Sequence, residues 1–372
     1  MKKILIFSLA YYPHVGGAEV AIKEITDRIP DIEFHMLTRR VRGEAREERI
    51  GNILVHRVSG GPSYLSKILF VPRAALAARA LHREHHFDIF WAMMSYMLFP
   101  VVLLRWLGTR VPYLLTLQEG DPFEHVFSRS RIVLFRPLLA SGFRHAAAVQ
   151  AISTFLAGWA KRSGYRGEPM VIPNGVDTKA FAGRAIPHED TILITTSRLF
   201  LKNAVDDVIR ALALLPAVRF RILGIGPEEK KLRALAQECG VAERVEFVGY
   251  VDHSHLPSAL HAADIFIRPS RSEGMGNSFI EAMAAGLPVI ATQEGGIADF
   301  LFDAKRNPGK PTTGWAVDKD SPEQIAEAVQ DILAHPEQVV RVKATAAKMV
   351  AEKYDWDLIA RQMRGLFARI GV

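Results

Sequence analysis

The sequence predicts an α/β fold of two Rossmann-like domains that face a central cleft, and three observations support this prediction. Short apolar runs alternate with helical patterns, which is typical of a parallel sheet with crossover helices. The alternation stops at the turn-forming residues Pro173, Asn174 and Gly175 and then begins again. A chain of 372 residues is also longer than one hydrophobic core usually supports. We therefore expect one domain over residues 1–175 and another over 176–355.

The first half contains short apolar runs that we predict as buried strands. Helical patterns lie between several of them, at residues 18–29, 67–85 and 154–163. The strand sequences are "KILIFSL", "EFHMLT", "ILVHRV", "DIFWAM", "PYLLTL", "AAVQAI" and "MVIP".

The second half repeats the pattern and ends in a helical run, "WDLIARQMRGLFARI", with apolar residues at helical spacing. We predict helices at residues 203–214, 228–238, 277–285 and 322–334. The strand sequences are "TILITTSRL", "RFRILG", "RVEFVGY", "DIFIRPS", "LPVIAT" and "GWAV". Open parallel sheets bind ligands beyond the carboxyl ends of their strands, so a site is expected in the loops that follow strands.

Composition limits the class of protein. Hydrophobic residues make up 49% of the chain and charged residues 23%, which indicates a globular rather than a disordered protein. The single cysteine, Cys239, cannot form an internal disulfide, so we expect a reducing compartment and a cytoplasmic protein.

The net charge of +7 is unevenly distributed. Residues 1–175 carry 23 Lys and Arg against 14 Asp and Glu, whereas residues 176–372 carry 24 against 26. A basic first half indicates either a solvated basic surface or an anionic partner, namely nucleic acid or a membrane surface. The basic residues are dispersed and no nucleic-acid-binding module is recognisable, so we expect no nucleic acid partner.

Two apolar stretches raise the question of membrane targeting. The start, "MKKILIFSLAYYPHVGG", resembles a signal peptide but lacks an A-x-A cleavage pattern, and we interpret it as a buried strand and a glycine turn. The longest apolar stretch, "MLFPVVLLRWLG", is interrupted by Pro100 and Arg105 and is too short to span a bilayer.

Glycines and basic residues follow several predicted strands. Gly16 and Gly17 precede a helix that we expect to begin at Ala18, where backbone amides either approach an anion or form a plain turn. Arg198 and Lys202 lie beyond a strand, where they either pair with a diphosphate or remain solvated. In "LGIGPEE", Gly224 and Gly226 either admit a nucleotide base or simply form the turn; these two are also in a strand-following loop.

The stretch "EGMGNSFIEAMAAGLPVIAT" carries the most specific pattern. Glu273 lies at a strand end, and Glu281 lies about one turn into the next helix. Between them, Gly274 to Ser278 offer backbone amides at a helix start, where phosphate binds readily. One carboxylate would then hold a ribose and the other a sugar. The alternative is that both glutamates only favour a helix amino terminus.

Two other patterns resemble metal sites, but we interpret them otherwise. Asp318, Lys319 and Asp320 form a D-x-D triplet in which Asp320 or Ser321 is expected to cap a helix. His82, His85 and His86 lack suitable ligand spacing with a carboxylate, so we interpret them as a surface cluster.

Segments in the same order along nearly the whole chain resemble retaining glycosyltransferases of family 4, which have the GT-B fold. The stretch from Glu273 to Thr292 closely resembles the E-x7-E motif of that family. The resemblance implies that the final helix, residues 356–372, crosses back to the first domain. The matching segments are "PHVGGAE", "QAIS", "VIPNGVD", "SRLFLKN", "ILGIGPEEKKL", "VEFVGYV", "ADIFIRPSRSEGMGNSFIEAMAAGLPVIAT" and "EGGIADFL".

The resemblance also assigns roles. The second domain would bind a nucleoside-diphosphate sugar, and the first a glycan or lipid-linked acceptor. Glu273 would contact the donor sugar and Glu281 the ribose. The remaining donor contacts would come from Arg198 and Lys202 on the diphosphate, from amides at Met275, Gly276, Asn277 and Ser278, from Gly224, and from Gly17 in the first domain.

Two departures from the family pattern affect these roles. Family members usually carry lysine where "LKNAVDD" has Asn203, with Lys202 one position earlier. Many also have a histidine after the "LLT" strand, where this chain has Gln118 and Glu119, followed by Asp121 and His125. We take these four as candidates for the acceptor side, although Gln118 cannot act as a base near neutral pH.

The predicted function is therefore retaining sugar transfer in cell-envelope or polysaccharide synthesis. UDP, GDP and ADP donors remain open, and we expect neither a metal nor another cofactor, because basic side chains and amides can stabilise the departing diphosphate. The alternatives are an epimerase-like enzyme of the same fold and a non-catalytic sugar-nucleotide-binding protein. Arg, Phe and Leu stripes at residues 63–73 and 127–147 are either ordinary helices or membrane-surface segments, so peripheral attachment at the inner membrane face is a further hypothesis.

Overall fold

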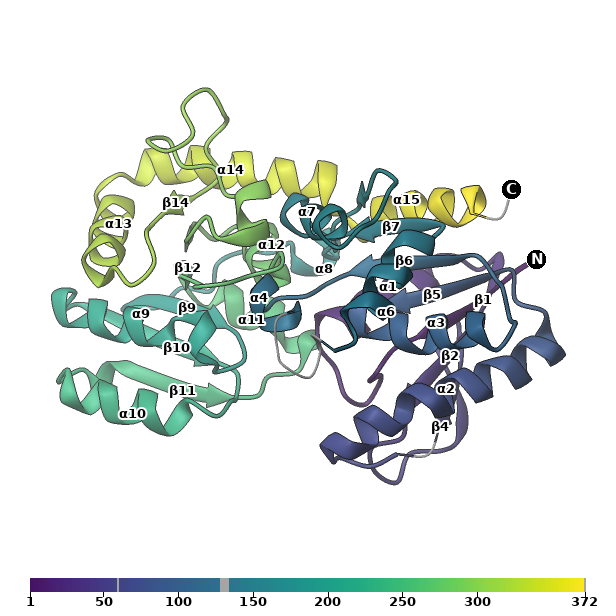
Figure 1. Cartoon of the computed structure of the whole chain (residues 1–372). Helices are drawn as coiled ribbons and strands as arrows, with labels where there is room; N and C mark the ends of the chain where they lie inside the picture. Colours follow the sequence, from purple (N-terminus) through teal and green to yellow (C-terminus); the bar gives the residue numbers. More distant parts are fainter. Residues whose placement is uncertain (59, 128–133, 371–372) are drawn as a thin grey trace. The chain divides into compact units, whose positions relative to one another are not determined.

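A computed structural model describes residues 1–58, 60–127 and 134–370 and divides them into two compact units (Figure 1). Unit 1 contains the described residues up to Asn174 and those from Trp356 onward, and unit 2 is Gly175–Asp355. Each unit is built on its own sheet flanked by helices. The expected pair of Rossmann-like parallel-sheet domains is therefore confirmed, and the expected boundary lies one residue from the observed one.

The sheet of unit 1 is parallel except at one edge, where β3 runs antiparallel to β4. Every strand predicted in the first half forms. The polar strand β3 was missed because "EERI" lacks an apolar run. In spatial order the strands are β3 (Glu47–Ile50), β4 (Ile53–Val58), β2 (Ile32–Arg39), β1 (Lys2–Phe7), β5 (Ile89–Met93), β6 (Tyr113–Leu117), β7 (Ala148–Ala151) and β8 (Met170–Val171).

Helices cover both faces of this sheet, which explains why its central strands are continuous apolar runs. The last helix, α15 (Trp356–Arg369), packs on α1 and buries Trp356, Ile359 and Phe367 in the unit 1 core, as expected from the fold class. The other helices are α1 (Gly17–Asp27), α2 (Tyr64–His85), α3 (Leu98–Trp106), α4 (Phe123–Phe127), α6 (Arg136–His145) and α7 (Thr154–Arg162), with a short turn η1 (Ser95–Met97).

The sheet of unit 2 is wholly parallel, and every strand predicted in the second half forms. Its spatial order is β11 (Val245–Gly249), β10 (Val218–Leu223), β9 (Thr191–Thr196), β12 (Ile265–Arg268), β13 (Val289–Ala291) and β14 (Trp315–Ala316). The helices are α8 (Thr178–Phe181), α9 (Val205–Ala211), α10 (Glu229–Glu238), α11 (Leu256–His261), α12 (Asn277–Ala284), α13 (Pro322–Ala334) and α14 (Pro336–Lys353). The short turns are η2 (Leu201–Asn203), η3 (Leu212–Leu214), η4 (Ala242–Arg244), η5 (His253–His255) and η6 (Gly295–Asp299).

In each sheet, the strand order reverses at the first strand of the unit. The strand β1 lies between β2 and β5, and β9 lies between β10 and β12. At β1 and β9, one crossover connection therefore runs toward one edge of the sheet and the next toward the other edge. The loops that follow the carboxyl ends of these strands and their neighbours diverge and leave a crevice. This arrangement places a candidate ligand-binding crevice beyond β1 in unit 1 and beyond β9 in unit 2.

Three local expectations are wrong. Helix α1 begins at Gly17 rather than Ala18. Ser321 occupies the cap position of α13, but its hydroxyl donates to the Lys319 carbonyl, and the Asp320 carboxylate accepts from Arg271 at 2.6 Å, so neither side chain caps the helix. Both side chains instead hydrogen-bond to groups outside α13. His85 is not simply part of a surface cluster, because its ring lies within 4.8 Å of Glu33 and His35.

The membrane-related expectations are tested only in part. In the described part of the chain, no helix is both long enough and apolar enough to cross a bilayer. The stripe predicted at residues 127–147 includes residues 128–133, and the final helix was predicted to reach residue 372; residues 128–133 and 371–372 lie outside the described residues.

Candidate active site

The loops after β9 and β12 lie next to each other, because these two strands pair at the switch point of unit 2. Arg271 joins the loops. Its backbone amide donates to the Lys202 carbonyl at 2.7 Å, and its Nη1 donates to the Leu201 carbonyl at 2.7 Å. The same guanidinium contacts Asp206 at 2.8 Å and Asp207 at 3.0 Å at the start of α9. One arginine thus fixes the β9 loop against the segment that leads to Glu273.

Glu273 is held by a buried arginine. The Arg268 guanidinium, at the carboxyl end of β12, donates from Nη2 to Glu273 Oε2 at 2.7 Å, and the Gly274 amide donates to Oε1 at 3.0 Å. Arg268 is 6% exposed, and burial lowers its pKa, whereas the charges of Glu273 and Glu281 act in the opposite direction. Arg268 therefore lies within electrostatic reach of both glutamates of the motif, and it orients the first of them.

Gly276 shapes the start of α12. It adopts φ 88° and ψ 85° at the N-cap position, a left-handed conformation that favours glycine. A Cβ atom here would lie 2.5 Å from the Phe279 ring and 2.8 Å from Arg268 Nη2. The ring of Phe279 in turn lies under the Arg268 guanidinium, 4.3 Å from its centroid to Cζ. The absence of a side chain at Gly276 thus allows Arg268, Phe279 and the loop to pack together.

The neighbouring residues of the motif lie on the same turn. Met275 is 1% exposed, so only its backbone can serve a ligand. Asn277 is the first residue of α12, and Ser278 is buried with a hydroxyl that has no hydrogen-bond partner among the described residues. Amides at a helix start carry partial positive charge, so this turn can receive an anion.

Glu281 lies inside α12 and is 8% exposed. Its Oε1 lies 3.1 Å from Nε2 of His253, which belongs to the turn η5 after β11. His253 also packs against Phe181, with ring centroids 5.6 Å apart. The second glutamate is therefore positioned by a histidine that the sequence pattern did not single out.

Arg198 and Lys202 lie on the β9 loop as predicted. Arg198 is exposed, and its guanidinium lies 5.9 Å from the Phe200 ring centroid. Asn203, which replaces the lysine of the family pattern, is 5% exposed and donates from Nδ2 to the Arg198 carbonyl at 2.5 Å. Asn203 therefore folds the loop and leaves both basic residues at its surface side, with Lys202 half-buried.

Gly224 and Gly226 allow the loop after β10 to pack against the β9 loop. Gly224 has φ 142°, and a Cβ there would lie 1.8 Å from the Ser197 carbonyl oxygen. A Cβ on Gly226 would lie 2.4 Å from the Leu199 carbonyl oxygen, and the Leu199 amide donates to the Ile225 carbonyl at 3.1 Å. Close packing of the backbone therefore requires glycine at both positions. Gly224 lies where the loops after β9 and β10 meet.

In unit 1, the loop after β1 leads into α1. Gly16 is the N-cap in an extended conformation, and Gly17 is the first helical residue. A Cβ on Gly16 would lie 3.0 Å from Glu19 Oε2, a carboxylate of the first helical turn. The glycine turn thus opens α1 at the switch point of the unit 1 sheet.

Gln118 and Glu119 follow β6 and serve the structure of unit 1. The Gln118 side-chain amide donates to Asn174 Oδ1 at 3.0 Å, and Asn174 Nδ2 lies 3.4 Å from Gln118 Oε1. Glu119 is 4% exposed and accepts from the amides of Ser95 at 2.6 Å and Gln118 at 3.0 Å. Burial raises the pKa of Glu119, although the amide hydrogen bonds act against it. Of these two, only Gln118 is partly exposed.

Asp121 and His125 line a cavity of about 130 Å³ in unit 1. Ser95 and Tyr96, which follow β5, lie on its wall together with Phe99 and Leu139. The Ser95 amide is the group that Glu119 holds, so the buried carboxylate fixes one wall of the cavity. The structure therefore places Asp121 and His125 on one largely apolar cavity, and Glu119 holds part of its wall through Ser95.

Sequence patterns missed the residues that support these side chains. Arg268 was part of the apolar strand "DIFIRPS", Arg271 lies in the matching segment just before Glu273 but was given no role, and His253 belongs to no motif. An arginine in a strand that is otherwise fully buried was the available signal, because such a charge needs a partner. His253 and Arg271 gave no signal, since their partners are distant in the sequence.

Two family models match the chain and together cover most of it. Residues 176–349 match Glycosyl transferases group 1, and residues 15–180 match Glycosyltransferase Family 4. A relative from Mycobacterium tuberculosis (strain ATCC 25618 / H37Rv), a GDP-mannose-dependent alpha-(1-6)-phosphatidylinositol monomannoside mannosyltransferase, is 30% identical over 323 residues. The alignment covers 79% of this chain and 71% of the relative.

Solved structures agree on the fold. Sucrose-phosphate synthase from Thermosynechococcus elongatus has a TM-score of 0.85 at 20% identity over 99% of both chains. Anabaena HepE, solved in complex with UDP and glucose, has a TM-score of 0.81 at 19% identity over 99% of this chain and 100% of its own. These likenesses concern the fold, which is that of GT-B glycosyltransferases. With the family models and the mycobacterial relative, they lead to the conclusion that the chain belongs to glycosyltransferase family 4.

Proposed function

We propose that the protein transfers a sugar from a nucleoside-diphosphate sugar to a glycan or lipid-linked acceptor with retention of anomeric configuration. One observation carries the proposal. At the switch point of unit 2, Arg268 holds Glu273 at 2.7 Å beside a left-handed Gly276 that opens α12. This arrangement offers a fixed carboxylate and helix-start amides side by side, as a sugar attached to a diphosphate requires.

The roles follow from charge and position. Glu273 accepts hydrogen bonds from hydroxyls of the donor sugar. The amides at Met275 to Ser278, together with Arg198 and Lys202, stabilise the negative charge of the departing diphosphate. Because these groups supply positive charge themselves, the proposed reaction needs no metal. We assign no covalent nucleophile.

Glu281 is proposed to bind the ribose. A carboxylate offers more acceptor sites than one hydrogen bond uses, so the contact with His253 leaves capacity for ribose hydroxyls. Gly17 would approach the donor from unit 1, and Gly224 would lie near its base. Gln118, Asp121 and His125 are proposed to face the acceptor, with Glu119 fixing the loop beneath them.

The donor and the site of action extend the proposal. The mycobacterial relative is named for GDP-mannose and a phosphatidylinositol mannoside, so GDP-mannose is the first donor to assay, followed by UDP- and ADP-sugars. A lipid-linked acceptor fits an enzyme that works in the cytoplasm at the inner face of the membrane, in the synthesis of envelope glycans.

A substitution at Glu273 tests the reaction. We expect Glu273→Gln to lower transfer at least about 100-fold while the protein still binds the nucleoside diphosphate, because the amide no longer stabilises charge developing on the sugar. Glu246→Gln is the matched control, since Glu246 also accepts from an arginine, Arg221, at 2.8 Å but lies on the exposed strand β11. Unchanged transfer by the Glu273 variant would refute the assignment.

Two product measurements distinguish the alternatives. An epimerase-like enzyme converts the donor without an acceptor, whereas a transferase needs one, and a non-catalytic protein binds the donor without turnover. NMR of the product tests retention, since the anomeric configuration must match that of the donor. An inverted product would overturn the retaining mechanism and leave the transferase assignment in place.

An exposed apolar face on α2 supports peripheral membrane attachment. Tyr64, Leu65, Ile68, Leu69 and Leu76 are between 38% and 61% exposed and recur at helical spacing on the basic half of the chain. Such a face can lie on an anionic membrane surface with nearby arginines and lysines on phosphates.

Sedimentation with vesicles tests the attachment. We expect the protein to bind vesicles that contain anionic lipid at low salt, and Leu65→Asp to weaken binding about tenfold. Val340→Asp is the control, because Val340 is 67% exposed on α14 of unit 2. Absence of binding, or equal loss in both variants, would contradict the proposal.

A further inference from the structure

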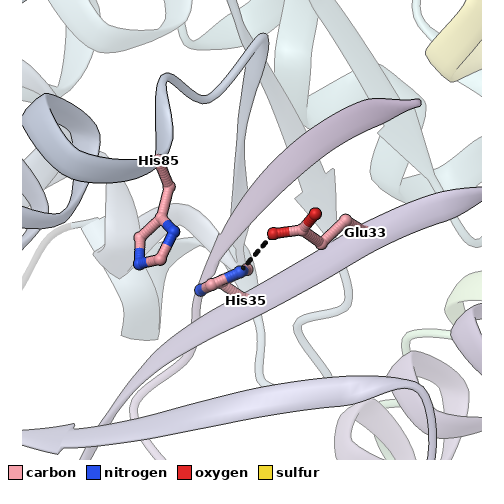
Figure 2. A group of neighbouring side chains, drawn as sticks. All are labelled: Glu33, His35 and His85. Carbon is pink, nitrogen blue, oxygen red and sulfur yellow. Dashed lines mark hydrogen bonds and ion pairs between the residues drawn. The ribbon is translucent and has the colours of Figure 1, made fainter.

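We propose that unit 1 holds a stabilising zinc ion through Glu33, His35 and His85, with water as the fourth ligand. Glu33 and His35 lie two positions apart on β2 and therefore on one face of the sheet, and His85 is the last residue of α2 (Figure 2). The fold thus brings together ligands that are some fifty residues apart in the sequence, as zinc sites built on a tertiary fold require.

The geometry is close to that of a zinc site. One ligand atom from each of the three residues lies within 4.8 Å of the other two. A tetrahedral zinc ion with ligand bonds of about 2.0–2.1 Å holds its ligand atoms about 3.3 Å apart. His35 Nε2 and Glu33 Oε1 are 2.9 Å apart, so the adjustment required falls on the His85 ring. The side chain of His85 is 23% exposed and ends the helix, which gives it room to turn.

His35 belongs to a chain of contacts between ring nitrogens and carboxylates. His35 Nδ1 lies 3.0 Å from His56 Nε2, and His56 Nδ1 lies 2.9 Å from Glu47 Oε2. Glu47, His56, His35 and Glu33 therefore form a row of three hydrogen-bond contacts, which involve four ring nitrogens and two carboxylates. Two neutral rings carry only two N–H groups, so one contact lacks a proton and brings two lone pairs together.

A zinc ion resolves this contact. If His56 donates to Glu47 and His35 donates to His56, then the Nε2 lone pair of His35 faces the Glu33 carboxylate. A cation bound between them uses both groups as ligands. A metal-bound histidine typically donates its other N–H to a carboxylate or to another acceptor, which matches the contacts through His56 to Glu47. His35 is 2% exposed, so its own ring nitrogens have little access to water.

The site is separate from the proposed transfer site. His35 pairs with Leu5 of β1, and Glu33 pairs with Lys3 near the start of that strand, whereas the donor and acceptor loops follow the carboxyl ends of strands. Lys3 Nζ lies 3.4 Å from the second Glu33 oxygen, and Glu84 lies 3.8 Å from His85. A zinc ion here would tie the end of α2 to β2 and would stabilise unit 1 without taking part in chemistry.

Zinc binding by the untagged full chain tests the proposal. After metal is removed with a chelator and zinc chloride is then added, we expect the protein to retain one zinc ion per chain through gel filtration. The thermal midpoint of the unit 1 transition should rise by about 5–10 °C at a hundredfold excess over the dissociation constant. Inorganic zinc chloride is the probe, and isothermal titration gives the affinity.

Two variants and a control separate binding from misfolding. His85→Gln should weaken zinc binding at least about 100-fold, whereas His86→Asn, at the exposed left-handed residue next to it, should bind as the native chain does. Glu33→Gln should lose the zinc-dependent rise, yet its metal-free form should melt no lower than the native metal-free chain, because the amide can donate to His35 Nε2. The proposal is overturned if the native chain retains no zinc, or if His85→Gln and Glu33→Gln both bind it as tightly as the native chain.

Discussion

The residues of the motif act through neighbours that hold them in place. Glu273 is fixed by Arg268, Glu281 by His253, and the β9 loop by Arg271. These supporting residues limit the positions that each carboxylate can adopt before a substrate binds. In the proposed reaction, such preorganisation would lower the cost of arranging charges.

Gly276 provides a residue-scale prediction. Gly276→Ala should destabilise the fold by about 1–3 kcal/mol and weaken donor binding at least tenfold, because a Cβ at φ 88° meets Phe279 and Arg268. Gly286→Ala is a matched control: Gly286 has φ 78°, but its nearest neighbour would be Lys343 Cε at 4.0 Å. It should lose about 1 kcal/mol of stability and keep its donor affinity. Donor titration and urea unfolding measure both; an equal loss of affinity in the two variants would show that strain alone is responsible.

Glu119 gives a pH-dependent prediction. Burial raises its pKa above the ordinary value of 4.5, so the folded protein holds this proton more tightly than the unfolded chain does. Its contribution to stability is therefore complete below about pH 4.5 and is lost as the pH rises through the folded pKa. The Glu119→Gln variant has no carboxyl group to titrate here. Its unfolding free energy, relative to that of the native protein, should therefore increase from about pH 4.5 to about pH 8. Urea unfolding across this range measures the difference, and parallel curves would contradict the prediction.

At the scale of elements, the last helix completes the first unit. Phe367 of α15 packs edge-on against Trp91, with ring centroids 5.1 Å apart, and also contacts Phe34 at 6.1 Å. All three side chains are buried in one core cluster. The apolar spacing of "WDLIARQMRGLFARI" predicted an amphipathic helix. This helix packs against the sheet of unit 1, whose strands come much earlier in the sequence.

Phe367→Ala tests this packing. We expect a loss of about 3–5 kcal/mol of unfolding free energy in unit 1, because removing a buried ring leaves a cavity among Trp91, Phe34 and the neighbouring helix. Arg361→Ala, on the exposed face of the same helix, should change it by less than about 0.5 kcal/mol. Hydrogen exchange resolves the units, and an equal loss of protection in unit 2 would contradict the assignment of α15.

At the scale of the whole molecule, each unit has its own sheet and core, and each sheet has its own switch point. The charge is also divided: residues 1–175 carry the basic excess, and residues 176–372 are slightly acidic. If unit 2 binds the diphosphate as proposed, it must rely on a few local cations and amides rather than on net charge.

Donor binding should therefore protect one unit first. With saturating GDP or UDP, we expect hydrogen exchange to slow mainly at residues 197–204, 224–226 and 269–278, which form the loops after β9, β10 and β12. Residues in β2 and α2 should change little and serve as the internal control. Protection confined to unit 1 would refute the proposed division between donor and acceptor binding.

The sequence by itself determined the two α/β units, their apolar strands, and the loop and helix that carry Glu273 and Glu281, because apolar periodicity and turn residues are local properties of the chain. It did not determine what holds those groups. Arg268 reaches Glu273 across the end of a strand, His253 reaches Glu281 from another loop, and His85 meets Glu33 and His35 only once α2 packs on β2. Only the tertiary structure decided these contacts. The path of the backbone after β12 brings Arg268 to Glu273, and strand order and helix packing bring together the other residues, which lie far apart in the sequence.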